Sequence, residues 1–408
     1  MAQSRRAVVI GGGIGGLTAA VALSQGGWDV TVLERAPSLD PVGAGISLAP
    51  NSLRALDVIG LGDEIRDLAA WQGDGGLRTP SGRWLSRTDA AAVAERFGGP
   101  LVLLHRATLV NSLAARLPSD AVRTGSAATV ADPGDAGRPA RVHTPDGERE
   151  ADLVVAADGI RSAVRRALFP EHPGTVYSGF TTWRVVIPVP GVEFASHETW
   201  GRGRIWGSHP LKDGRVYAYA AAITPAGECA PDDEKAELLR RYGDWHHPIP
   251  AILAAARPED VLRHDVHHIA EPLPAYHRGR VALVGDAAHA MQPTLGQGGN
   301  QAIEDAVVLA AHCDDLAAYT AARLPRTTAI ARRAAKAGRL NMMTGRAGIA
   351  VRNTALAALS KAAPLLFLRS YEDIAGWRPP QAPYAAGKAP ADNHQRRQPR
   401  EGRLYRTR

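Results

Sequence analysis

The sequence predicts a mixed α/β fold, and three observations support this prediction. An apolar run near the N-terminus, Val8–Ile10, leads into a glycine-rich turn and then a helix-like pattern. A second apolar run, Val281–Val284, leads into an acidic and glycine-rich turn before a helix-like stretch at Gln301–Ala310. Between these two units, residues 175–224 shift to β character. We therefore expect an α/β unit that is interrupted by a mainly β segment.

The N-terminal turn, Gly11-Gly-Gly13-Ile-Gly-Gly16, has the glycine spacing that suits a bound dinucleotide. Gly11 would make the tight turn, Gly13 would let a pyrophosphate touch the backbone, and Gly16 would let the helix pack closely on the strand. The next strand, Val30–Leu33, ends in Glu34, which is placed for the ribose hydroxyls of an adenosine. A turn that only packs a helix on a sheet is the alternative, but it does not explain Glu34.

The second glycine-rich segment, residues 285–306, is suited to an anionic, hydroxylated group. Asp286 follows the strand and can accept hydrogen bonds from hydroxyls, while the helix start offers unpaired N–H groups. A third segment, residues 152–162, consists of a strand, the turn Asp158-Gly159 and an arginine-bearing helix. A nicotinamide-dependent dehydrogenase needs only the first site, whereas a long dinucleotide such as FAD could span both ends.

With these three motifs in order, the chain resembles the class A, single-component FAD-dependent aromatic monooxygenases, such as para-hydroxybenzoate, salicylate and urate hydroxylases, over about residues 5–340. The resemblance implies a Rossmann-like, discontinuous FAD-binding domain of the GR2 type, with an inserted β-sheet substrate domain and C-terminal helices. The expected divisions are the first FAD-binding part at 1–174, the substrate sheet at 175–270, the second FAD-binding part at 271–345, the helices at 346–377 and a basic, disordered tail at 378–408.

The resemblance also implies which residues bind the cofactor. Arg106 would reach the ribityl–pyrophosphate region, Asp286 the ribityl chain and Pro293 the isoalloxazine, while Asp158 and Gly159 are tied to both FAD and NAD(P)H. The implied FAD-binding set is Gly11, Gly13, Gly15, Gly16, Glu34, Arg35, Gly45, Arg106, Asp158, Gly159, Asp286, Pro293, Gly296, Gly298, Gly299 and Asn300.

The implied reaction uses NADPH or NADH and O₂. The nicotinamide would dock transiently, because no second nucleotide-binding fold is visible, and would reduce the flavin. A flavin hydroperoxide would then insert one oxygen atom into a small or medium aromatic substrate, most simply by hydroxylation. Two alternatives stay open: a flavin-dependent dehydrogenase or reductase of the same fold, and a non-catalytic binding protein that retains the fold.

The middle segment supplies the candidate residues for substrate and catalysis. Arg184 lies on an otherwise apolar strand, where a buried guanidinium needs an anionic partner, either on the substrate or on a neighbouring acid. His209 could act as a general base through a near-neutral pKa, although its position by a hairpin favours a surface role. Pro293 is the third catalytic candidate. The candidate substrate-binding residues are Trp183, Arg184, Trp206, Tyr217 and Tyr219, with core packing as the alternative for the tyrosines.

Composition narrows the functional class. A chain of 408 residues with 45% hydrophobic residues predicts a globular protein of two to three domains. Cys229 and Cys313 lack metal-ligand spacing and predict free thiols in the cytoplasm. The histidines at 264, 267 and 268 alternate between two faces of a strand-like run without a cysteine, so no metal site is expected.

The net charge of +7 does not predict binding to nucleic acid. Residues 378–408 hold eight Lys/Arg and two Asp/Glu, so the tail carries +6 and the remaining body only +1. No signal peptide or membrane-spanning helix is expected, because charged residues and a proline interrupt the apolar stretch at 347–368. The expected partners are an aromatic small molecule and O₂, with no nucleic acid and no membrane, for a monomer or homodimer.

Overall fold

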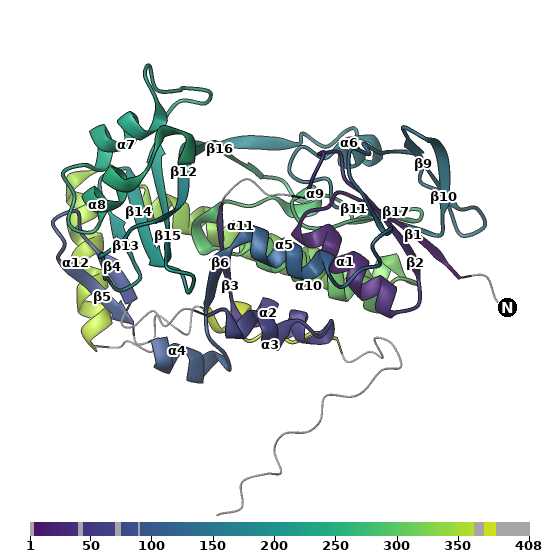
Figure 1. Ribbon diagram of the computed structural model, residues 1–408, viewed down its shortest axis with the longest axis horizontal. Helices are drawn as coiled ribbons and strands as arrows, with labels where there is room; N and C mark the ends of the chain where they lie inside the picture. Colours follow the sequence, from purple (N-terminus) through teal and green to yellow (C-terminus); the bar gives the residue numbers. More distant parts are fainter. Residues whose placement is uncertain (1–3, 40–43, 70–74, 89, 363–370, 381–408) are drawn as a thin grey trace, which may run out of the picture.

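The computed structural model describes residues 4–39, 44–69, 75–88, 90–362 and 371–380. It contains two main sheets, which lie toward opposite ends of the molecule and are bridged by long helices between them (Figure 1). The predicted disordered tail at 378–408 falls almost entirely outside the described residues.

The first sheet has six strands in the order β17-β18-β11-β1-β2-β7. Its centre is parallel, with β1 between β11 and β2, and only the edge strand β17 is antiparallel. The central strands are continuously apolar, as expected for a parallel sheet that is covered on both faces. The strands are β1 (Arg6–Ile10), β2 (Asp29–Leu33), β7 (Val122–Arg123), β11 (Leu153–Ala156), β17 (His277–Arg278) and β18 (Val281–Leu283).

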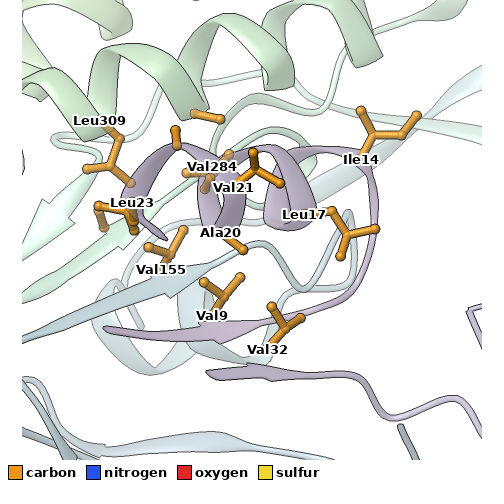
Figure 2. Packing of buried hydrophobic residues seen from close by; sticks show 14 of the residues in the cluster. Val9, Ile14, Leu17, Ala20, Val21, Leu23, Val32, Val155, Val284 and Leu309 are labelled. Carbon is orange, nitrogen blue, oxygen red and sulfur yellow. The ribbon is translucent and has the colours of Figure 1, made fainter. Parts of the chain in front are cut away.

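Helix α1 (Ile14–Gln25) is buried between this sheet and α10 (Gly298–Ala311). Figure 2 shows α1 with Val9, Val32 and Val155 of the sheet on one side and Leu309 of α10 nearby on another. Because both sides of α1 meet protein, its sequence is apolar almost all round rather than amphipathic.

The second sheet has seven strands in the order β16-β12-β15-β14-β13-β4-β5 and is antiparallel except between β13 and β4. Helices α7 (Glu234–Tyr242) and α8 (Ile249–Ala255) cover one of its faces. The predicted boundaries placed residues 75–88 in the first FAD-binding part, but β4 and β5 belong to this second sheet. The strands are β4 (Gly75–Arg78), β5 (Trp84–Thr88), β12 (Thr175–Pro188), β13 (His197–Trp200), β14 (Arg204–Pro210), β15 (Arg215–Ile223) and β16 (Leu262–Ile269).

The remaining elements connect and cover the two sheets. The strands are β3 (Gly45–Leu48) and β6 (Val102–His105), which pair with each other, and β8 (Thr129–Asp132), β9 (Ala140–Thr144) and β10 (Gly147–Ala151). The helices are α2 (Pro50–Val58), α3 (Gly62–Asp67), α4 (Ala90–Phe97), α5 (Arg106–Ala114), α6 (Ala163–Leu168), η1 (Pro258–Asp260), α9 (Asp286–His289), η2 (Pro293–Leu295), α11 (Leu316–Asn341) and α12 (Arg346–Ala362). Within the described residues, no helix has the length and apolar character needed to cross a membrane.

A buried network of charged side chains joins α10 to α11. The Arg323 guanidinium contacts Glu304 Oε2 and Asp305 Oδ1, each at 2.6 Å, and Arg326 Nε contacts Glu304 Oε2 at 2.7 Å. Burial alone would raise the pKa of Asp305, but His289 and Arg323 outweigh burial and lower this pKa to about 2. Both carboxylates are fully buried, so the network is favourable only while every charge keeps its partners.

Replacing Arg323 with methionine should therefore destabilise the protein strongly. We expect a loss of about 3–5 kcal/mol, because Glu304 and Asp305 would be left buried with too few cationic donors. The matched control is Arg141→Met, which removes a largely exposed ion pair with Glu148 and should cost less than about 1 kcal/mol. Urea denaturation followed by circular dichroism checks both variants, and equal shifts of the two midpoints would contradict the prediction.

Candidate functional site

The candidate site lies at the carboxyl ends of β1, β2, β11 and β18, where ligands bind in open parallel sheets. These strands lead directly into Gly11, Glu34, Ala157 and Val284, respectively. The two glycine-rich segments meet here, because a Cβ added to Gly15 would lie 3.1 Å from Val284 Cγ1 and 3.2 Å from Ala302 Cβ.

The glycines of the first turn have different roles. Gly11 has φ +108°, and an added Cβ would lie 2.4 Å from Ala157 O, so the fold itself requires glycine there. An added Cβ on Gly16 would lie 2.0 Å from Gly11 O, which reflects the close approach of helix and turn. Gly13 differs, because the nearest atom to its added Cβ is Arg106 Nη2 at 3.7 Å. The space above Gly13 is thus open to a ligand.

Glu34 helps to shape this turn. Its Oε2 accepts a hydrogen bond from Gly12 N at 2.7 Å, and its Oε1 accepts one from Ala36 N at 2.8 Å. Each oxygen keeps a further lone pair, so the half-buried carboxylate can also accept from ribose hydroxyls. The neighbouring Arg35 is exposed.

Arg106 and Asp286 interact electrostatically beside the open space above Gly13, which we call the groove. Arg106 begins α5, and its backbone N–H donates to Ala44 O at 2.8 Å, next to Gly45. Its guanidinium has no hydrogen bond or ion pair with any residue that the structure describes. Surrounding protein desolvates this guanidinium and lowers its pKa, Asp286 and Glu34 act to raise the pKa, and Arg184 lowers it further. Charges from four distant segments therefore share one groove.

The Asp158-Gly159 turn is held by an arginine that the sequence analysis missed. Asp158 Oδ2 caps α6 by accepting from Ala163 N at 2.8 Å, whereas its Oδ1 is buried without a partner among the described residues. Arg165 Nη1 donates to Ala287 O at 3.0 Å, and Nη2 donates to Ile160 O at 2.7 Å. Arg165 thus ties the second motif to the third. Two adjacent arginines in α6 gave no signal as to which one is buried.

The turn after α9 presents backbone donors toward the same groove. Gly296 adopts the left-handed conformation with φ +62°, and the first N–H groups of α10 have no partner within the helix and no side-chain cap. The Asn300 side chain is already occupied: its Oδ1 accepts from Ala49 N at 2.8 Å, and its Nδ2 donates to Gly296 O at 2.7 Å. Asn300 therefore braces the turn through its side chain and can offer only its backbone N–H to a cofactor.

One face of the seven-stranded sheet packs against Gly45 and carries Arg184, which is close enough to affect the pKa of Arg106. Strand register places Arg184 opposite Tyr219, and His209 opposite Tyr217, all on this face. The Tyr217 ring lies against Gly45, where an added Cβ would be 2.3 Å from Tyr217 Cγ. Tyr217 is thus brought against β3, whose partner strand β6 leads to Arg106, and the other candidates Arg184 and Tyr219 share the face of Tyr217.

Trp183 and Trp206 lie on the opposite face, which differs from the predicted substrate contact. They are 2% and 0% exposed and pack beneath α7 and α8. Trp183 Nε1 donates to Glu234 Oε2 at 2.6 Å rather than facing the groove. Because Arg184 and Trp183 are adjacent in a strand, both cannot point to one face, and the sequence did not show which face is lined by helices.

His209 lies on the sheet face that carries Arg184 but does not have the expected acid–base character. It stacks on Tyr219 with ring centroids 5.4 Å apart, and its Nδ1 hydrogen-bonds with Ser196 Oγ at 2.6 Å. Burial lowers the pKa of His209 to about 3, so the imidazole is neutral at pH 7 and is a weak base. Pro293, the other catalytic candidate, is an exposed residue of η2 without a titratable group.

The residues present fit a long, anionic dinucleotide. The open space above Gly13 suits a pyrophosphate, Arg106 forms no ion pair with a described residue, and the first N–H groups of α10 have no partner within the helix. Two buried acceptors, Asp158 Oδ1 and Asn51 Oδ1, also lack partners in the described part of the chain. Over the same residues, no group of three His, Cys, Asp or Glu side chains could hold a metal ion.

Comparisons with known proteins point to the same cofactor. A family model described as "FAD binding domain" matches residues 5–334. Aurachin C monooxygenase/isomerase of Stigmatella aurantiaca is 38% identical over 327 residues, covering 79% of this chain and 84% of that protein. The 3-amino-4-hydroxybenzoate 2-monooxygenase of Streptomyces cremeus is 36% identical over 354 residues, covering 81% and 86%.

The fold is also that of a solved flavoprotein. The structure of Klebsiella pneumoniae HpxO complexed with FAD and uric acid matches with a TM-score of 0.81 at 30% identity, covering 91% of this chain and 96% of that one. The predicted fold class, an FAD-binding α/β unit with an inserted sheet and C-terminal helices, is confirmed.

The space above Gly13 provides a direct test of the cofactor site. Gly13→Ala should fold normally, because its backbone at φ −78° suits alanine and no protein atom is closer than 3.7 Å to the added Cβ. We expect FAD to bind at least about tenfold more weakly, because the methyl group would occupy the ligand's space. Gly99→Ala, with no atom within 4 Å of the added Cβ, is the control. FAD fluorescence titration measures both affinities, and equal affinities would argue against this site.

Proposed function

The chain belongs to the FAD-binding-domain family that includes the single-component FAD-dependent aromatic monooxygenases, and from this premise we propose that its substrate is an anionic aromatic compound held by Arg184. The enzyme is an FAD-dependent monooxygenase with NAD(P)H as the electron donor, as the sequence predicted. The chemistry that bound FAD supplies is reduction by NAD(P)H followed by activation of O₂. The protein's own residues must bind the cofactor, orient the substrate and exclude water.

The observation that carries the proposal is the missing partner of Arg184. Its side chain is half-buried, on the sheet face that packs against Gly45, and no described residue forms a hydrogen bond or ion pair with it. A desolvated guanidinium without an anion is unfavourable, and a planar carboxylate or phenolate is its best-matched ligand. Arg106 adds positive charge nearby, because Arg184 is close enough to lower the pKa of the Arg106 guanidinium.

The surrounding side chains favour a flat ring. His209, Tyr217 and Tyr219 form a group of neighbouring rings with centroids 5.4–6.1 Å apart. Burial raises the pKa of both tyrosines, so their hydroxyls stay protonated and can donate hydrogen bonds. Tyr219 already donates to Glu198 Oε1, which holds its ring in place, whereas no described residue pairs with the Tyr217 hydroxyl. We therefore assign Tyr217 as the donor to substrate and Arg184 as its anion partner.

A substrate screen tests the proposed reaction. We expect aromatic carboxylates and acidic phenols, more than neutral aromatics, to stimulate NAD(P)H oxidation by the FAD-loaded enzyme. Mass spectrometry after reaction under ¹⁸O₂ should find one labelled oxygen atom in the product. Product formation without O₂ would instead indicate a dehydrogenase, and stimulation by neutral aromatics alone would exclude the anionic class.

Arg184→Met should weaken binding of the substrate without removing FAD. We expect the dissociation constant for the best aromatic anion to rise at least about tenfold, because a charge-assisted hydrogen bond is lost. The control, Arg202→Met, alters an exposed arginine on the turn before β14 and should bind the anion as the native enzyme does. Titration of the flavin absorption spectrum with the anion measures both constants. An unchanged constant in Arg184→Met would remove Arg184 from the pocket.

A further inference from the structure

Residues 371–378, near the C-terminal end of the described chain, lie against the turn of the flavin site. This stretch, which we call the C-terminal strap, lies beyond residues 5–334, the segment that matches the family model. Ile374 is 1% exposed and packs with Met291 and Ile330, while Tyr371 and Leu295 pack at the edge of this cluster. The strap therefore contacts residues on both sides of Pro293.

Tyr371 makes two hydrogen bonds to this turn. Its hydroxyl donates to Leu295 O at 2.6 Å and accepts from Gln297 Nε2 at 3.2 Å. Leu295 O belongs to the same peptide unit as the Gly296 N–H, which bonds to Pro293 O at 2.9 Å. One hydroxyl thus sets the orientation of the peptide that enters the left-handed Gly296, and it restrains the side chain that precedes α10.

The strap itself is fixed by two half-buried arginines, Arg54 of α2 and Arg326 of α11. Arg54 Nε donates to Trp377 O at 2.8 Å, and its Nη2 donates to Ala375 O. Arg326 donates to Asp373 O at 3.0 Å and to Ile374 O at 3.1 Å, while its other bonds reach Glu304. Because these bonds hold the strap's backbone, the Tyr371 hydroxyl is presented from a rigid support rather than from a loose end.

We propose that Tyr371 is a positioning residue for the flavin-site turn, acting from outside the family's matched segment. Its hydroxyl holds the Leu295–Gly296 peptide and Gln297 so that the first N–H groups of α10 keep the direction that the cofactor needs. Burial raises the pKa of Tyr371, which keeps the phenol protonated as the donor that this role requires. The inference rests on the flavin site described above and adds a residue that acts through the turn.

Tyr371→Phe isolates the hydroxyl, because it keeps the ring and its apolar contacts. We expect the dissociation constant for FAD to rise about 3- to 10-fold, the range for one lost hydrogen bond. We also expect a shifted visible absorption spectrum of bound flavin and more hydrogen peroxide per NAD(P)H oxidised. Fluorescence titration with FAD, absorption spectroscopy and a peroxide assay measure these three effects.

The matched control is Tyr242→Phe, which removes a buried hydroxyl that donates to a backbone carbonyl, Ala221 O, at 2.9 Å in the seven-stranded sheet. It should lower the thermal midpoint at least as much as Tyr371→Phe does but leave FAD affinity and the flavin spectrum unchanged. If Tyr371→Phe binds FAD with native affinity and spectrum, or if both variants shift them equally, the positioning role is wrong. Failure of the native protein itself to bind FAD would instead overturn the flavin site.

Discussion

The buried charges of α10 and α11 are the constraint on which the rest of the site depends. Glu304 accepts from Asn51 Nδ2 of α2 at 2.7 Å, and Asp305 accepts from Gly285 N at 2.9 Å. Asp305 also pairs with His289 at 2.5 Å, and Arg326 carries the network on to the C-terminal strap. Adjacent carboxylates of one helix thus hold the start of α2, the Gly285-Asp286 turn and the strap together. A missing cation would leave charge uncompensated in a medium of low dielectric constant.

Much of the proposed FAD site could be predicted from the sequence, because it depends largely on backbone groups. Glycine at Gly11 and Gly16 is dictated by contacts that any side chain would break, and glycine at Gly13 by space that the ligand needs. These constraints determine the residue type and the spacing of the glycines, so the sequence alone reveals them. Arg165 escaped prediction because its role depends on which side of a short helix is buried.

The proposed substrate site was harder to predict, because the sequence does not show which of the two faces of a strand lines the site. The sequence analysis named both Trp183 and Arg184 as substrate-binding candidates, and only the position of α7 and α8 shows that the tryptophans face the helices. Strands β4 and β5 lie much earlier in the sequence than the other strands of their sheet. Neither strand has a motif that would predict this pairing. His209 was expected to titrate near neutral pH, but its burial, invisible in sequence, lowers its pKa to about 3.

Some arginines of this chain have partners within the protein and others do not, and this difference allows function to be inferred from charge. Arg323 and Arg326 have carboxylate and carbonyl partners within the protein, so their role is structural. Arg106 of α5 and Arg184 of β12 interact electrostatically, and neither forms an ion pair with a described residue. Two desolvated cations that repel each other are unfavourable unless ligands supply negative charge to both. A pyrophosphate at Arg106 and an aromatic anion at Arg184 would satisfy both cations, and this is the arrangement that we propose for the two ligands.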